Sequence, residues 1–129
     1  MYGYSKHLFD LWITREHCEN DLVSLKFFNV YGPNEYHKGS MQSLVVKAYH
    51  QVLRKGTISL FASSDPLYAD GDQKRDFVYV KDCTAMIAWL LQNREICGIR
   101  NIGTGVARSF NDLAQVIFSA MNREKQIEY

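Results

Sequence analysis

The apolar run Leu22-Val23-Ser24-Leu25-Lys26-Phe27-Phe28 decides the fold class. It has the length of a strand, and its apolar residues are dense enough for a strand that is buried on most sides. Just before it, residues 2–18 place Leu8, Leu11 and Trp12 at helical spacing. A buried strand that follows a helix is typical of a parallel α/β sheet. We therefore predict an α/β fold with a helix over residues 2–18 and a strand over residues 22–28.

The predicted strand ends in an abrupt loop. Gly32-Pro33-Asn34 combines residue types that interrupt regular structure, and the following residues up to Met41 are polar and include a glycine. Ligands bind at the carboxyl ends of strands in open α/β sheets. We therefore expect this loop to line a ligand site.

The remaining elements follow from periodicity and from start and stop signals. A helix is predicted over residues 40–55, capped by Gly56, and another over residues 82–93 is apolar on nearly every side, so we expect it to be deeply packed. Ser109 and Asp112 resemble a capping box. The chain further predicts a helix from Ser109 to residue 122, extended segments over 58–61, 74–80, 99–102 and 126–129, and a surface loop over 62–73.

Composition excludes several classes of function. With 129 residues, of which 47% are hydrophobic and 22% charged, the chain fits one compact core, and its net charge of +1 gives no basic footprint for nucleic acid or anionic membranes. The longest apolar run, residues 85–91, is far below the ~20 residues that cross a bilayer. Together with the lack of a secretory signal pattern, this predicts a cytoplasmic protein.

Cysteine and histidine usage gives no sign of a metal site. Cys18, Cys83 and Cys97 are odd in number and lack Cys-x-x-Cys spacing, which argues against a disulfide framework or structural zinc. The four histidines lack metal-ligand spacing as well. We predict reduced thiols and no bound metal.

Tyr2 and Lys6 are a candidate catalytic pair. They lie four positions apart and so share one face of the predicted helix, whereas Tyr4 points elsewhere. A neighbouring cation can activate a phenol as a general acid/base. The spacing alone leaves a plain alternative open, in which Tyr2 is a surface residue and Lys6 pairs with Asp10 one turn on.

Two glycine-containing segments match binding motifs in part. Gly103-Thr104-Gly105 follows a predicted strand, but Arg108 stands where a dinucleotide fingerprint has its third glycine, so we predict a turn. Asp70-Gly71-Asp72 begins like a calcium loop whose ligand series is not completed by a glutamate at the right distance. We predict a solvated turn there too.

Four motifs in order resemble the extended short-chain dehydrogenase/reductases that act on nucleotide sugars. They are Tyr2-x-x-x-Lys6, Phe28-Asn29-Val30-Tyr31-Gly32-Pro33, Arg75-Asp76-Phe77-Val78-Tyr79-Val80-Lys81-Asp82 and Asn101-Ile102-Gly103-Thr104-Gly105. The resemblance covers essentially the whole chain and implies the second half of a Rossmann-like enzyme, because the family's glycine-rich fingerprint precedes Tyr-x-x-x-Lys. It implies that residues 1–33 end the dinucleotide-binding sheet and that residues 34–129 mostly bind substrate. We therefore expect a fragment that is inactive alone.

A more specific resemblance involves the segment Asn34-Glu35-Tyr36-His37-Lys38-Gly39-Ser40-Met41 and the carboxyl-terminal Gln126-Ile127-Glu128-Tyr129. Both are similar to the branch of the family that inverts carbon 6 of ADP-heptoses. This implies a bacterial isomerase of lipopolysaccharide-core precursor synthesis, with tightly held NADP, an ADP-sugar substrate and a homo-oligomeric assembly. The acidic loop over residues 65–73 is longer than the resemblance leads us to expect.

The resemblance also implies roles for single residues. It makes Tyr2 and Lys38 the two acid/base groups and has Lys6 bind the nicotinamide ribose, which suits an inversion through a ketone because protons must be handled on both faces. For Arg75, a guanidinium can hold a pyrophosphate through paired hydrogen bonds, and a solvated turn is the alternative. The implied cofactor contacts are Lys6, Val30 and Lys38, and the implied substrate contacts are Asn29, Ser40, Lys47, Phe61, Ala62, Ser63, Ser64, Arg75 and Tyr129.

Other functions stay open on the sequence alone. Another nucleotide-sugar epimerase or a dehydratase of the same family would share the four motifs. A dehydratase needs acidic groups beside Tyr2, and Asp10 or Glu35 could approach it. A fragment that keeps the fold without activity is the third possibility.

Overall fold

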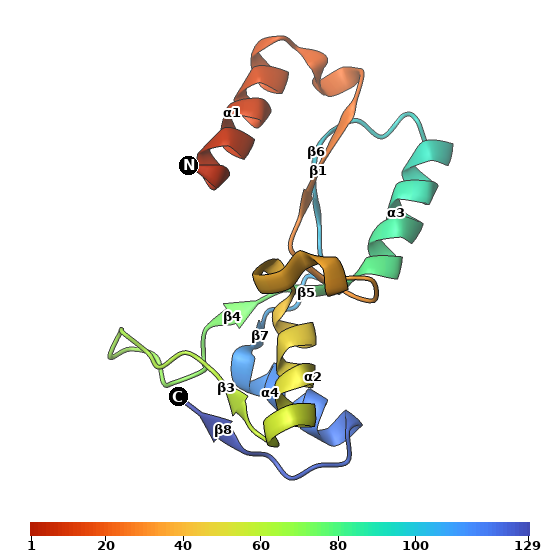
Figure 1. Ribbon diagram of the computed structural model, residues 1–129. Helices are drawn as coiled ribbons and strands as arrows, with labels where there is room; N and C mark the ends of the chain where they lie inside the picture. Colours follow the sequence, from red (N-terminus) through yellow and green to blue (C-terminus); the bar gives the residue numbers. More distant parts are fainter.

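Helices and strands alternate along the chain in the computed structural model, which describes residues 1–129 (Figure 1). This confirms the predicted α/β class. No helix combines the length and the apolar character that a membrane span requires. The elements are α1 (Tyr2–Arg15), η1 (Cys18–Asn20), β1 (Val23–Phe27), β2 (Asn29–Tyr31), η2 (Tyr36–Met41), α2 (Leu44–Lys55), β3 (Ile58–Ser59), β4 (Lys74–Arg75), β5 (Phe77–Tyr79), α3 (Val80–Gln92), β6 (Gly98–Ile102), β7 (Arg108–Ser109), α4 (Phe110–Ala120) and β8 (Ile127–Glu128).

The strand predicted over residues 22–28 is observed as β1, but the prediction that it is buried on most sides is wrong. None of its residues is buried, and Phe27 is 45% and Phe28 48% exposed, because β1 has only one strand neighbour within these residues. β1 pairs in parallel with β6, with Val23 opposite Gly98, and β2 pairs in parallel with β5. Between them, the Val30 amide donates to the Phe28 carbonyl at 3.0 Å, a two-residue bond that marks a bend where the strand changes partner. In Figure 1, α1 and α3 lie on opposite sides of the β1–β6 pair. The parallel pairing predicted for this strand is confirmed.

The apolar side chains form two separate cores. The larger lies between α2, α4, β3 and β8, which we call the α2–α4 unit and which fills the lower part of Figure 1. The smaller lies among β1, β2, β5, β6 and α3, which together with α1 we call the sheet unit. The buried residues are Ala48, Val52, Ile58, Leu60, Phe110, Ala114, Ile117 and Phe118 in the first, and Val78, Cys83 and Ile102 in the second.

Helix α4 begins with the predicted capping box. The Asp112 amide donates to Ser109 Oγ at 3.0 Å, and the Ser109 amide donates to Asp112 Oδ2 at 2.9 Å. These hydrogen bonds lower the pKa of Asp112 from its ordinary value. The capping box and the left-handed cap of α2 at Gly56, where φ is 76°, are both confirmed.

Helix α2 begins later than predicted. The sequence predicts its start at Ser40, but Ser43 is its N-cap and accepts a hydrogen bond from the Val46 amide at 3.3 Å. Residues 36–41 form the short 3-10 helix η2, interrupted at Gly39, where φ is 52° and ψ is −121°. A residue in that conformation ends a helix. Ser40 and Ser43 are both of a type favoured at N-caps, so the sequence pattern alone could not show that Ser43 is the N-cap.

Two expectations about the sheet-unit helices are wrong. Helix α3 was predicted to be deeply packed, yet Trp89 is 47% and Leu91 69% exposed while Cys83 and Leu90 are buried. Within the 129 residues only one face of α3 packs against strands, so its other faces stay exposed. Helix α1 ends at Arg15 instead of continuing to residue 18, because the chain enters the left-handed region at His17, where φ is 56°.

Candidate functional site

Tyr2 and Lys6 meet on one face of α1, as their spacing predicts. The Lys6 ammonium nitrogen lies 5.4 Å from the centroid of the Tyr2 ring. Tyr2 is 80% exposed, so its phenol is accessible. Both side chains line a cleft of about 630 Å³ between α1 and β1. The pair is therefore present and accessible, and its acid/base role stays a prediction.

Asp10 takes a partner other than the one considered in the sequence. Its carboxylate accepts a hydrogen bond from Lys26 on β1, and this ion pair joins α1 to the sheet. The alternative in which Lys6 pairs with Asp10 is wrong. The Lys6 ammonium therefore stays available beside Tyr2.

Lys38 and Ser40 lie on η2, the short helix between β2 and α2. Lys38 is exposed, and its ammonium nitrogen lies 3.7 Å from Glu35 Oε2. The structure records no hydrogen bond or ion pair between Lys38 and Tyr2. The two predicted acid/base groups thus belong to separate elements. Tyr2 is on α1, which lies beside β1, and Lys38 is on η2, which follows β2.

A second hollow gathers several predicted substrate residues. It has a volume of about 380 Å³ and lies between β2, β3, α2 and the start of α4. Its lining includes Asn29, Val30, Lys47, Phe61 and Phe110. Three of the predicted substrate contacts and one predicted cofactor contact, drawn from segments far apart in the sequence, therefore share one hollow.

Arg75 contacts Phe110, one of the residues that line this hollow. Its guanidinium carbon lies 5.8 Å from the centroid of the Phe110 ring, which lines the hollow. One of its nitrogens donates to the Lys74 carbonyl at 2.7 Å, and no acidic side chain pairs with it. A guanidinium stacked in this way keeps donors free for a phosphate.

Tyr129 and the acidic loop are tied to the same region through Asn111, the residue after Phe110. The Tyr129 hydroxyl donates to Asn111 Oδ1 at 2.8 Å, and the Asn111 amide group donates to the Asp70 carbonyl at 2.8 Å. The Ser63 amide donates to Asp70 Oδ1 at 2.5 Å. The surface loop over residues 62–73 is thus a set of in-chain turns, and it carries the predicted contacts Ala62, Ser63 and Ser64. The turn at residues 70–72 is not solvated throughout as predicted, because Gly71 is buried against the Asn111 side chain.

The Gly-Thr-Gly segment after β6 is a turn held by Asp76. The amides of Thr104 and Gly105 donate to the Asp76 carboxylate at 3.0 and 2.8 Å, and the Thr104 hydroxyl donates at 2.7 Å. Burial would raise the pKa of Asp76, but these hydrogen bonds outweigh it and the pKa is lowered. Because its amides are occupied, this turn cannot cradle a phosphate, in agreement with the predicted turn.

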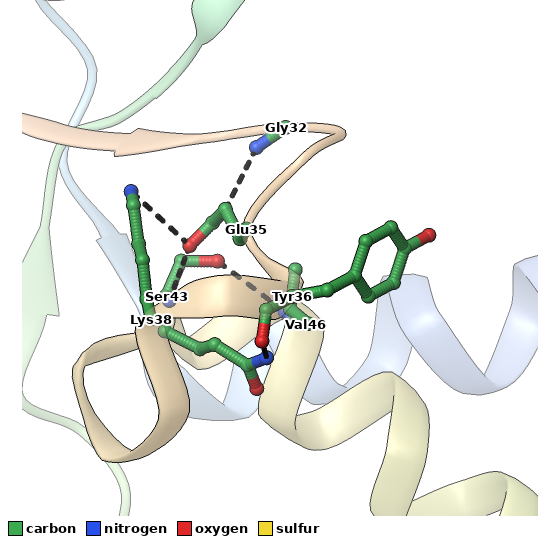
Figure 2. A network of polar contacts seen from close by, with 7 residues as sticks. Gly32, Glu35, Tyr36, Lys38, Ser43 and Val46 are labelled. Carbon is green, nitrogen blue, oxygen red and sulfur yellow. Dashed lines mark hydrogen bonds and ion pairs between the residues drawn. The ribbon is translucent and has the colours of Figure 1, made fainter.

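Glu35 has a place in the site that the sequence did not predict, since the sequence offered it only as a possible acid beside Tyr2. It is 5% exposed and accepts hydrogen bonds from the amides of Gly32, at 3.1 Å, and Ser43, at 2.6 Å (Figure 2). Burial would raise the pKa of Glu35, but these bonds and the nearby Lys38 ammonium outweigh it, so the pKa is lowered. Glu35 follows no helical or strand periodicity in the sequence. The one sequence signal for it is its place directly after Gly32-Pro33-Asn34.

A further apolar hollow of about 480 Å³ lies between α2 and α4. Tyr31, Tyr49, Val116 and Met121 are among its lining residues. It contains none of the predicted catalytic or substrate residues, so the candidate site consists of the Tyr2–Lys6 cleft, the Lys38 segment and the hollow at Phe110.

Comparison with known proteins gives a consistent result. Residues 1–103 match the family described as NAD dependent epimerase/dehydratase. The chain is 59% identical over 129 residues to an ADP-L-glycero-D-manno-heptose-6-epimerase of Nitratidesulfovibrio vulgaris strain DP4, and 45% identical over 128 residues to one of Fusobacterium nucleatum. It covers 100% and 98% of its own length in these matches, but 40% and 39% of theirs.

A solved structure agrees with these sequence matches. The ADP-L-glycero-D-manno-heptose-6-epimerase of Helicobacter pylori superposes with a TM-score of 0.80 at 28% identity. The match covers 98% of this chain and 38% of that one. The chain thus spans about two fifths of the length of the proteins it matches.

Proposed function

Since the chain belongs to the NAD dependent epimerase/dehydratase family, we propose that it carries the acid/base groups and the sugar-nucleotide-binding part of an NADP-dependent isomerase. Its substrate is an ADP-glycero-manno-heptose, inverted at carbon 6, which serves lipopolysaccharide-core precursor synthesis. The observation that carries the proposal is the accessible Tyr2–Lys6 pair, in a chain 59% identical throughout to a protein named for that activity.

Tyr2 and Lys38 divide the proton chemistry in this proposal. When bound, the nicotinamide cofactor accepts and returns the hydride. Tyr2 takes or gives the proton of the carbon-6 hydroxyl on one face, and Lys38 does so on the other, because one fixed group serves only one face. Lys6 holds the nicotinamide ribose and supports Tyr2, whose ring its ammonium already overlies at 5.4 Å.

The residues present fit the nicotinamide end of the cofactor. The Lys6 ammonium and the Tyr2 phenol are adjacent, exposed and free of acidic partners, as contacts to a ribose require. Val30 lies at the bend between β1 and β2 and lines the hollow at Phe110. The choice of NADP over NAD rests on the resemblance, as does the homo-oligomeric assembly.

The substrate-binding assignment follows the hollow at Phe110. Arg75 stacks on that ring with donors free for the ADP pyrophosphate, and Lys47 adds a second cation from α2. Ser40, Ala62, Ser63, Ser64 and Tyr129 remain predicted contacts. In the same proposal, residues 1–33 serve mainly the cofactor and residues 34–129 mainly the substrate.

The acidic residues favour an epimerase over a dehydratase. A dehydratase needs an acidic group beside Tyr2, and the sequence offered Asp10 and Glu35. Asp10 pairs with Lys26, and Glu35 accepts from two backbone amides next to Lys38. Both carboxylates therefore already have partners, and of the two only Asp10 lines the same cleft as Tyr2.

A chimera tests the proposal. This chain would replace the matching 129-residue segment of the N. vulgaris relative, which supplies the rest of the enzyme. We expect the purified chimera to bind NADP and to interconvert the two ADP-heptose epimers, separated by anion-exchange chromatography. The 129-residue chain alone should do neither, and the chimera with Tyr2→Phe should lose turnover. A folded chimera that binds NADP and leaves the epimers unchanged would contradict the proposed function.

A further inference from the structure

The segment between β2 and α2 carries Lys38 and Ser40 but has little regular structure to hold it. Asn34 and Gly39 both adopt positive φ angles, 68° and 52°, so no continuous helix crosses the segment. Its internal backbone bonds are isolated, as from the Lys38 amide to the Glu35 carbonyl at 3.0 Å. A segment built in this way needs side-chain contacts to keep one conformation.

Glu35 supplies such contacts at both ends of the segment. It is the one buried residue between positions 31 and 47. Its Oε1 accepts from the Gly32 amide, where the segment begins, and its Oε2 accepts from the amide of Ser43, the N-cap of α2 (Figure 2). A single carboxylate therefore joins the end of β2 to the start of α2 through charge-assisted hydrogen bonds.

The same carboxylate reaches the predicted acid/base group. Figure 2 shows the Lys38 side chain directed at Glu35, with its Nζ 3.7 Å from the Oε2 atom that Ser43 also contacts. Glu35 thus holds the backbone of the segment and the ammonium group at one point. Glu35 is buried, and both of its carboxylate oxygens already have partners in its own segment, so it acts on that segment.

We propose that Glu35 is a positioning residue for Lys38: it clamps the segment over residues 32–43 so that the Lys38 ammonium is delivered to the face of carbon 6 opposite Tyr2. This inference rests on the proposed function. Because Glu35 acts through Lys38, its replacement changes the reaction while Lys38 is present and has no further effect once Lys38 is gone.

Hydrogen–deuterium exchange on the 129-residue chain tests the clamp. In Glu35→Gln, the side chain keeps one acceptor oxygen and turns an NH₂ group toward the second backbone amide. Losing a charged acceptor should speed exchange of the Gly32 and Ser43 amides by about tenfold or more. Glu35→Asp should restore part of the protection, and Glu124→Gln, at an exposed glutamate, should leave it unchanged. Unchanged exchange in Glu35→Gln would overturn the clamp.

A double-mutant cycle in the chimera tests the link to Lys38. Glu35→Gln should lower kcat about 100-fold and change KM for the ADP-heptose little. Glu35→Gln with Lys38→Met should be no slower than Lys38→Met alone. Losses that add would overturn action through Lys38. An unmutated chimera without activity would instead contradict the proposed function, and the exchange measurement would still decide on the clamp.

Discussion

The α2–α4 unit closes a core of eight buried side chains within the chain, whereas the sheet unit closes a core of three. Helix α1 of the sheet unit buries a single residue, Ile13, and leaves Leu8, Leu11 and Trp12 about half exposed. The hollow at Phe110 lies between α2, β3 and the start of α4 on one side and β2 and β5 of the sheet unit on the other, whereas the Tyr2–Lys6 pair lies wholly in the sheet unit. Within these residues, the proposed substrate-binding part therefore rests largely on the better packed unit, whereas Tyr2, the proposed acid/base group, lies on a helix with one buried residue.

The largest expected effect comes from breaking the larger core. Phe118 is fully buried in α4, and Phe118→Ala should lower the free energy of unfolding by about 3–5 kcal/mol through lost burial and a cavity. Trp12→Ala, a comparable truncation in α1, should cost less, about 1–2 kcal/mol, because the residue is already 49% exposed. Urea unfolding measures both. Equal losses would remove the contrast between the units.

The next largest effect tests whether Arg75 binds the substrate, as proposed. In the chimera, Arg75→Ala should weaken binding of the ADP-sugar by about 2 kcal/mol, roughly 30-fold, because a charge-assisted phosphate contact is lost. NADP affinity should stay nearly constant. Arg123→Ala, at an exposed arginine, should change neither affinity. Calorimetric titration gives both constants, and an equal loss for the two ligands would make Arg75 a structural residue instead.

The smallest effect concerns Asp76, which lies between β4 and β5 and accepts hydrogen bonds from the turn after β6. Its pKa is lowered in the folded chain, from an ordinary value of 3.8, so its stabilising contribution is complete above that value and is lost as pH falls through the folded pKa. Solvent screening keeps the effect modest. Asp76→Asn should lower the urea midpoint at pH 7, and the difference from the unmodified chain should vanish in acid below the folded pKa.

The control for this prediction is Asp21→Asn, at an exposed carboxylate with no hydrogen-bond partner. It should leave the midpoint and its pH dependence unchanged. A difference between Asp76→Asn and the unmodified chain that persists undiminished at low pH would show that the charge of Asp76 is not what stabilises the turn.

Local signals in the sequence were sufficient for much of the fold. The capping box of Ser109 with Asp112, the Gly56 cap and the strand at residues 22–28 each depend on signals within a few residues, and all three are confirmed, although the predicted burial of the strand is not. Tyr2 and Lys6 also lie close in sequence, so helical spacing alone predicts their contact.

Contacts between distant segments could not be predicted in this way. Asp10 pairs with Lys26, which lies 16 positions further along the chain, and not with Lys6. The Glu35 carboxylate accepts from the Ser43 amide at the other end of an irregular segment. The exposure of α3 depends on how many of its faces pack against other elements, and the amino-acid composition of the helix does not reveal that number. The predicted start of α2 was wrong because Gly39 leaves the helical conformation and the Ser43 amide donates to Glu35, and neither feature gives a periodic signal in the sequence.

In the proposed mechanism one chain supplies two proton-transfer groups, Tyr2 from the sheet unit and Lys38 from the segment before α2. The direct test measures net epimerisation and half-reactions, such as disproportionation of an aldehyde analogue, in chimeras carrying Tyr2→Phe, Lys38→Met or both. Each single variant should lose net turnover by about 100- to 10,000-fold yet keep the half-reaction that its remaining group serves, and the double variant should keep neither. A Lys38→Met chimera with raised KM and an intact kcat would contradict the claim.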